Sequence, residues 1–133
     1  MSIKLPENLE NTIGLRLIVN EQGFNEMLSL PRAIVYVSVN WSGQERVSRS
    51  IVYKALNDFK ISEIPIFKID CSEQEKKYIE DWLGNQPSSL QDFYFNGYGE
   101  TLLINYGQVV DYIRYPGQLG VEKTKLKIEH WLT

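Results

Sequence analysis

The chain has 133 residues, a single cysteine and a formal net charge of -3, and this length predicts one domain over residues 1–133. One cysteine excludes an internal disulfide and a multi-cysteine zinc site, and 14 Lys and Arg against 17 Asp and Glu leave no basic field for nucleic acid. Because no apolar stretch is long enough for a signal peptide or a membrane span, we expect a cytoplasmic protein that binds neither nucleic acid nor membrane.

The first half of the chain alternates predicted strands and helices. A polar lead-in, residues 1–13, precedes a core at about residues 14–132. Short β-branched runs predict the strands, and apolar residues that recur every three or four positions predict the helices. In chain order we expect a strand at 14–19, a helix at 21–30 capped by Asn20, a strand at 33–40, a long helix at 44–60, a strand at 64–71 and a helix at 72–83.

The strand at 33–40 and the long helix after it are the clearest of these elements. The strand sequence AIVYVSVN is nearly apolar throughout, which is typical of a strand buried on both faces. In the helix, Val47, Ile51 and Ala55 are spaced by four positions and predict one buried stripe. Ser42 followed three residues later by Glu45 matches a capping box at the start of this helix.

The second half begins with an aromatic segment and ends with a hairpin and a helix. Residues 85–99 contain Pro, Ser and Gly together with four aromatic residues, which predicts a long irregular loop. We expect strands at 101–106 and 109–115 joined by a Gly107-Gln108 turn, and a closing helix at 121–132. Right-handed crossovers make the first three strands parallel, so the prediction is a three-layer α/β/α sandwich with a five-stranded mixed sheet and about four helices.

The junction between the central strand and the long helix carries a family resemblance. It reads Trp41-Ser42-Gly43-Gln44-Glu45, and in this position it resembles the thioredoxin superfamily, in which the same junction reads Trp-Cys-Gly-Pro-Cys. The order of elements over about residues 14–132 also resembles that family. The resemblance implies the thioredoxin fold, and in the family the paired cysteines exchange disulfides.

The chain departs from the family pattern wherever thiol chemistry is concerned. Ser42 and Glu45 occupy the two cysteine positions, and neither side chain can carry a reversible sulfur exchange. Tyr36 stands near the place of a buried acidic residue of the family, and Gly99-Glu100 stand where the family has a cis-proline. The resemblance therefore implies a thioredoxin-like domain that is redox-inactive.

The carboxyl ends of the parallel strands define the candidate binding surface. Open α/β sheets bind ligands at this edge, which the junction and the 85–99 loop should share. We expect Trp41, Gly43, Tyr94, Tyr98 and Glu100 to form this surface. The aromatic residues of the loop either form an interface or fold inward and extend the core.

Charged side chains near this edge are interpreted as solvated. A catalytic pairing of Glu45 with Glu100 has no support from their spacing, so we interpret both as solvated charges. Arg46, Arg49 and Lys54 are interpreted as the solvated face of the long helix.

Two candidate nucleophiles remain. Cys71 directly precedes a predicted helix and is either a small buried apolar residue or a reactive thiol at a helix N-terminus. Ser42 would need a base, and the single histidine, His130, lies far along the chain, so we interpret Ser42 as a helix cap.

The sequence thus predicts a redox-inactive thioredoxin-like module that binds a protein partner or serves as an adaptor, with no cofactor, no metal and no catalytic residue. A diverged enzyme that uses the thiol of Cys71 is one alternative. A structural subunit that forms a homodimer through the aromatic loop is the other.

Overall fold

The computed structural model describes residues 10, 13–59, 64–70, 78, 81–82, 85–86 and 97–133. They contain a five-stranded mixed sheet in the order β1-β3-β2-β4-β5. β1, β2 and β3 are parallel, while β4 pairs antiparallel with β2 and with β5. The bounds are β1 Leu15–Ile18, β2 Ala33–Ser38, β3 Ile66–Asp70, β4 Thr101–Asn105 and β5 Gln108–Ile113. The predicted mixed sheet is confirmed.

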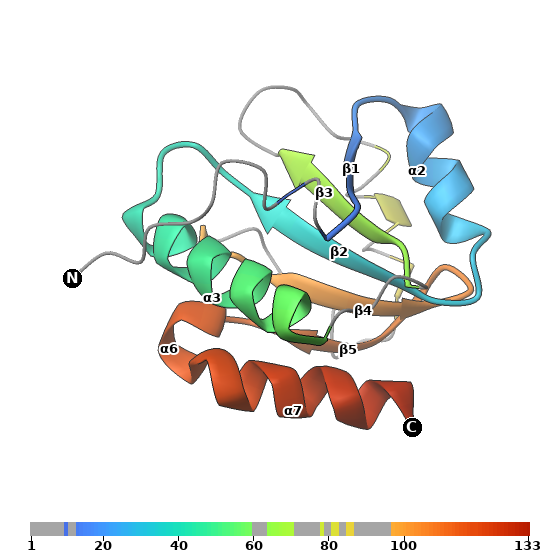
Figure 1. Ribbon diagram of the computed structural model, residues 1–133. Helices are drawn as coiled ribbons and strands as arrows, with labels where there is room; N and C mark the ends of the chain where they lie inside the picture. Colours follow the sequence, from blue (N-terminus) through green and yellow to red (C-terminus); the bar gives the residue numbers. More distant parts are fainter. Residues whose placement is uncertain are drawn as a thin grey trace.

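Helices pack on both faces of this sheet. Their bounds are α2 Glu21–Leu28, α3 Gly43–Phe59, α6 Pro116–Leu119 and α7 Val121–Leu132, and Glu10, Tyr78, Asp81 and Trp82 are helical as well. In Figure 1, α3 and α7 run side by side along one face of the sheet. Phe24 and Met27 of α2 pack in the cluster on the other face, and the three-layer sandwich is thereby confirmed.

β2 lies at the centre of the sheet and is buried on both faces. Val35 and Val37 pack in the cluster under α2, whereas Ile34 and Tyr36 pack in the cluster under α3 and α7. This alternation follows from the strand period of two residues. The apolar character of the whole strand is therefore explained by its position between two helical layers.

The predicted stripe of α3 is correct in part. Ile51 and Ala55 are buried, but Val47 is 53% exposed. In its place Ser48 faces inward, and the side chain of Glu45 one turn earlier is buried too. The first turn of α3 therefore turns polar side chains, rather than an apolar stripe, toward the sheet.

The hairpin turn lies one residue earlier than predicted. Tyr106 and Gly107 occupy the two turn positions with φ of 48° and 78°, the positive values that a two-residue hairpin turn of type I′ requires. Gln108 already belongs to β5. Pro116 and Gly117 begin the short helix α6, because proline is well accommodated in the first turn of a helix.

Other predictions concern residues that lie largely outside this description. The helix at 72–83 is described at Tyr78, Asp81 and Trp82 only, and the loop at 85–99 at residues 85–86 and 97–99. Cys71 and Tyr94 lie outside the described residues. In the described part of the chain no helix is long and apolar enough to cross a membrane.

Candidate functional site

Ser42 caps the N-terminus of α3 and is itself covered. Its Oγ accepts a hydrogen bond from the backbone N–H of Glu45 at 3.3 Å, which is the predicted capping contact. The same hydroxyl lies within donor distance of the Gly97 carbonyl and of Gln44 Oε1. Ser42 is buried, so its hydroxyl serves these hydrogen bonds and is not accessible to a substrate.

Glu45 is fully buried, and its interpretation as a solvated charge is wrong. Its carboxylate oxygens accept hydrogen bonds from Nη2 of Arg49 at 2.6 and 2.8 Å, and from Nε at 3.2 Å. Arg49 also donates to Oγ of Ser38 at the end of β2, at 3.1 Å. Burial of the carboxylate is thus compensated by a multidentate partner one helical turn away, which is what a buried charge requires. Arg49 therefore does not belong to a freely solvated face of α3.

Two tyrosines extend this polar layer under α3. The Tyr36 hydroxyl donates to the backbone carbonyl of Glu45 at 3.0 Å, and its ring packs edge-on against Tyr53. Tyr53 in turn donates to Oε2 of Glu10 at 2.6 Å. Burial and the nearby Glu45 carboxylate raise the pKa of Tyr36 well above its usual value. Burial and the hydrogen bond to Glu10 raise the pKa of Tyr53 likewise.

Glu10 joins the lead-in of the chain to the sheet. It accepts from Nζ of Lys68 on β3 at 3.3 Å, in addition to the bond from Tyr53. Partial burial opposes its ionisation, but the hydrogen bond from Tyr53 and the charge of Lys68 together lower the pKa of Glu10 below its usual value.

The backbone of residues 97–99 lies directly against α3. A Cβ on Gly97 would come within 2.7 Å of the Trp41 ring, and a Cβ on Gly99 would come within 2.8 Å of the Tyr36 hydroxyl and closer still to Ser48. Both glycines have positive φ. These positions accept no side chain, so the segment can approach the helix only because it is glycine-rich.

Glu100 is completely buried and cannot belong to a binding surface as predicted. Its Oε1 accepts a hydrogen bond from the backbone N–H of Tyr98 at 3.1 Å, and its backbone carbonyl accepts from Val37 on β2 at 2.9 Å. Glu100 thus shapes the end of β4, and the interpretation of its charge as solvated is wrong.

Ser48 fastens three segments together at this edge. Its Oγ donates to the carbonyl of Tyr98 and accepts from the backbone N–H of Gly117 at 2.9 Å. The Tyr98 ring stacks on Tyr115, with centroids 4.8 Å apart and planes 8° from parallel. α3, the 97–99 segment and α6 are therefore held as one unit.

Trp41 differs from the next residue of the junction in its exposure. Its side chain is 65% exposed, whereas Ser42 is buried. Gly43 is exposed beside it. Val47, one turn along α3, is also exposed and adjoins Gly117, next to Tyr115. We name this set, Trp41, Gly43, Val47, Tyr98 and Tyr115, the Trp41 surface.

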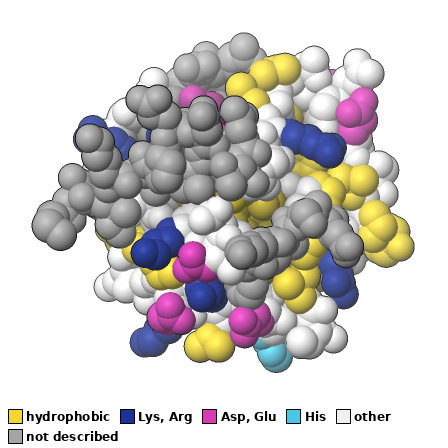
Figure 2. All heavy atoms as spheres, in the orientation of Figure 1, with side chains coloured by type: hydrophobic (Ala, Val, Ile, Leu, Met, Phe, Trp, Pro, Cys, Tyr) yellow, Lys and Arg dark blue, Asp and Glu magenta, His cyan; other side chains and the backbone are white. Residues whose placement is uncertain are grey.

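Charged side chains of both signs lie on the face of the molecule that Figures 1 and 2 show. Figure 2, in the orientation of Figure 1, shows Lys and Arg side chains close to Asp and Glu side chains on this face, with hydrophobic side chains between them. Where residues are described, no group of three His, Cys, Asp or Glu side chains is placed to hold a metal ion.

The structure brings together most of the residues singled out from the sequence, but in different roles. Trp41 and Gly43 lie on the surface, Tyr98 is half-buried beside them, and Ser42, Glu45 and Glu100 lie beneath. Sequence reasoning missed the structural role of Arg49. The spacing of four residues from Glu45 to Arg49 was the available signal, since side chains at i and i+4 meet on a helix.

Comparisons with known proteins agree with this architecture. A thioredoxin of Halobacterium salinarum is 12% identical, with 92% of this chain and 94% of that chain covered and a TM-score of 0.62. A thioredoxin of Trypanosoma brucei brucei is 12% identical, with 96% and 99% covered and a TM-score of 0.60. The oxidised thioredoxin of Plasmodium falciparum is 14% identical, with 90% and 99% covered and a TM-score of 0.59.

Sequence comparisons add nothing to these structural similarities, because no protein-family model and no curated protein matches the chain. At 12 to 14% identity, similarity of structure shows the fold alone. The chain has the thioredoxin fold, as the resemblance of its junction implies. Its activity has to be argued from the residues themselves.

Proposed function

We propose that this thioredoxin-fold chain is a redox-inactive protein-binding module, an adaptor that contacts its partner through the Trp41 surface. One observation carries the proposal: the two positions that hold cysteines in thioredoxins are buried and occupied by structural interactions, while Trp41 beside them is 65% exposed. The chemistry of the junction is lost, but its accessible aromatic residue is kept.

The contacts of Ser42 and Glu45 argue against thiol-disulfide exchange. An exchanging residue must present a thiolate to its substrate. Ser42 has no thiol, and its hydroxyl faces the Gly97 carbonyl beneath the surface. Glu45 is fixed by Arg49 and fully buried. Neither position offers a group that could form or resolve a mixed disulfide.

The composition of the Trp41 surface suits a protein partner. Trp and Tyr are enriched among the residues that dominate binding energy at interfaces, because they bury a large area at a small entropic cost. Here they are combined with an exposed valine and with a rigid backbone at residues 97–99, fastened by Ser48. We expect an apolar side chain of the partner to contact Trp41. A cytoplasmic location accords with the lone cysteine.

The experiment compares capture of partners from the native host by three baits: the wild type, Trp41→Ala and Leu126→Ala. Leu126 is the matched control, because it is a comparably exposed apolar residue on α7, outside the Trp41 surface. Both substitutions are at exposed positions, so we expect each variant to keep its fold, with a stability change within about 0.5 kcal/mol. Proteins retained by the wild type and Leu126→Ala but lost by Trp41→Ala are the expected result.

Three outcomes would contradict the proposal. Recovery of the same proteins by all three baits would exclude the Trp41 surface as the binding site. Reduction of insulin in the presence of a thiol reductant, abolished by Cys71→Ser, would favour the alternative of a thiol-dependent enzyme. The other alternative, a homodimer, would be supported by a dimeric mass in light scattering that Tyr94→Ser with Tyr98→Ser reduces to the monomer.

A further inference from the structure

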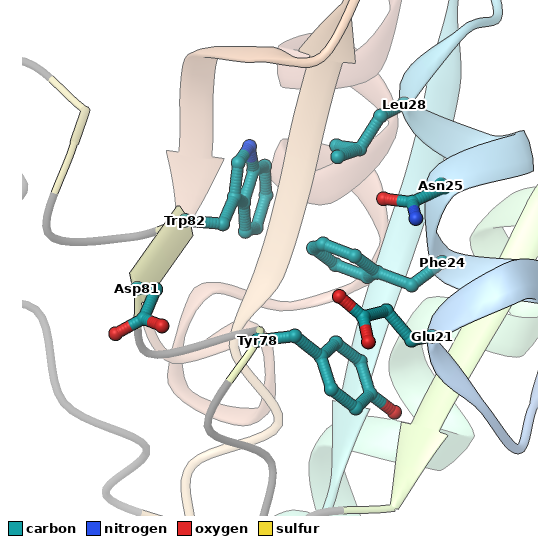
Figure 3. A pocket seen from close by; sticks show the side chains of 7 residues that line it. All are labelled: Glu21, Phe24, Asn25, Leu28, Tyr78, Asp81 and Trp82. Carbon is teal, nitrogen blue, oxygen red and sulfur yellow. The ribbon is translucent and has the colours of Figure 1, made fainter.

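A pocket of about 480 Å³ lies on the other side of the sheet from α3, away from the Trp41 surface. α2 forms one wall, and the helical residues Tyr78, Asp81 and Trp82 form the other. Figure 3 shows its lining side chains, which are Glu21, Phe24, Asn25, Leu28, Tyr78, Asp81 and Trp82. The volume falls in the range of small-molecule sites, and nothing in the proposed binding function uses it.

Aromatic rings form the apolar side of this pocket. The ring of Phe24 is tilted against Tyr78 at a centroid distance of 5.2 Å and meets Trp82 edge-on at 5.3 Å. Trp82 is held in place because its Nε1–H donates to the carbonyl of Gly107, in the β4–β5 turn, at 2.7 Å. Tyr78 and Trp82 both pack on Phe24, and the hydrogen bond of Trp82 fixes its ring, so the wall is preformed.

The charge of the pocket is negative. Glu21 and Asp81 line it, whereas no Lys or Arg is among its lining residues. Figure 3 shows the Glu21 carboxylate next to the rings of Phe24 and Tyr78, while Asp81 points away from the rings. Neither carboxylate forms an ion pair within the described residues. Glu21 therefore faces the pocket, and no Lys or Arg of the described part of the chain compensates its charge.

We propose that this pocket binds a small organic cation with an alkylated ammonium head group. The faces of aromatic rings attract cations, and quaternary ammonium groups are recognised in this way in proteins. The methyl groups of such a head bury against the half-buried rings of Tyr78 and Trp82, which the buried Phe24 ring supports from behind, and its charge is balanced by Glu21. An anion would be repelled by the two carboxylates, and a neutral apolar molecule would gain nothing from Glu21.

The test is an NMR titration of the full chain that follows the indole N–H signal of Trp82. The probes are choline and 3,3-dimethylbutan-1-ol, which has the same shape without the charge. We expect saturable shifts with choline and roughly tenfold weaker binding of the neutral probe. Equal affinity for both probes, or no saturable shift with choline, would overturn the proposal.

Three variants locate the charge that matters. Glu21→Gln should weaken choline binding by about fivefold, the loss of one exposed charge interaction. Asp81→Asn should weaken it less, and the control Glu129→Gln, an exposed carboxylate on α7, should leave the Kd unchanged. Equal effects of Glu21→Gln and Glu129→Gln would contradict a specific site.

A last arm distinguishes the source of the head group. A short peptide with a trimethylated lysine presents the same trimethylammonium group on a protein side chain instead of on a free small molecule. Tighter binding of this peptide than of choline would overturn the assignment to a small molecule. All these measurements are independent of Trp41, so failure here and failure of the adaptor proposal are separate results.

Discussion

The two faces of the sheet are stabilised in different ways. Under α2 the buried side chains are mainly apolar, with Phe24 and Met27 packed on alternate residues of β2, β3 and β4, and Gln86 is a buried polar exception. Under α3 the core also includes Tyr36 and Tyr53, and at the start of the helix it adjoins the buried Glu45 and Ser48. The stability of the α2 face depends mainly on close apolar packing. The stability of the α3 face depends in addition on paired buried polar groups.

This difference teaches how each face should respond to substitution. Loss of an apolar side chain leaves a cavity whose cost no single partner can offset. Loss of one member of a buried polar pair leaves the other without compensation, and removing both members restores part of the stability. Rescue by a second substitution is therefore expected at the α3 face only.

Phe24→Ala should give the largest loss of stability. Phe24 is 2% exposed and contacts both Tyr78 and Trp82, so its truncation should lower the free energy of unfolding by about 4 kcal/mol. Urea unfolding measures this change. A loss below about 1 kcal/mol would indicate that the rings of Tyr78 and Trp82 collapse into the space, and that the α2 face is loosely packed.

Glu45→Leu should lower the free energy of unfolding by about 3 kcal/mol, because it leaves Arg49 without its carboxylate. This energy is at the lower end of the range for buried ion pairs, since the Arg49 side chain is 29% exposed to solvent. Glu45→Leu with Arg49→Leu should recover part of the loss. If the double variant is less stable than the single one, pairing does not explain why the carboxylate is buried.

Gly99→Ala and Gly14→Ala isolate the effect of close packing against α3. The two glycines have nearly equal φ, 74° and 73°, but a Cβ on Gly14 meets nothing within 4 Å, whereas one on Gly99 meets Ser48 and Tyr36. Gly14→Ala should cost only the backbone term, about 1 kcal/mol. Gly99→Ala should cost at least about 2 kcal/mol more. Equal losses in thermal or urea unfolding would mean that the 97–99 segment moves aside freely.

The buried tyrosines should make the α3 face sensitive to alkali. Their folded-state pKa values are raised, so the folded protein keeps protons that the unfolded chain releases above its tyrosine pKa of about 10. Their contribution to stability is complete below that pH and declines above it, by about 1.4 kcal/mol per pH unit for each tyrosine.

Unfolding in urea between pH 9 and pH 11 measures this slope. Tyr53→Phe should reduce it, because this substitution removes one of the two buried hydroxyls whose pKa is raised. Equal slopes for the wild type and Tyr53→Phe would show that Tyr53 ionises as readily in the folded protein as in the unfolded chain.

Much of the fold could be predicted from the sequence because apolar residues recur with a different period in helices and in strands. The unbroken apolar run at 33–40 indicates a central strand, and its two-sided burial is observed. Gly107 marks the hairpin correctly, but the turn begins at Tyr106, since a type I′ turn needs two consecutive positive φ values and residues other than glycine rarely adopt one.

The site was less predictable because the tertiary fold decides which face of a helix or strand end is buried, even where the partner of a charge is close in the sequence. Glu45 and Glu100 have the composition of surface residues, yet both are completely buried, one against Arg49 and one at the end of β4. The exposure of Val47 has the same origin. The first two turns of α3 are oriented by the hydrogen bonds from Tyr36 to the Glu45 carbonyl and from Arg49 to Ser38, so the apolar period holds only farther along the helix.

The hydroxyl of Ser48 also has a consequence for the order of folding. It joins partners 50 and 69 positions away in the chain, Tyr98 and Gly117. Contacts of such separation close long loops and form after local structure is in place. The edge that carries Trp41 should therefore assemble late. Native-state hydrogen exchange at the Gly117 amide would report each transient separation of α6 from α3, since that amide is hydrogen-bonded to Ser48 Oγ.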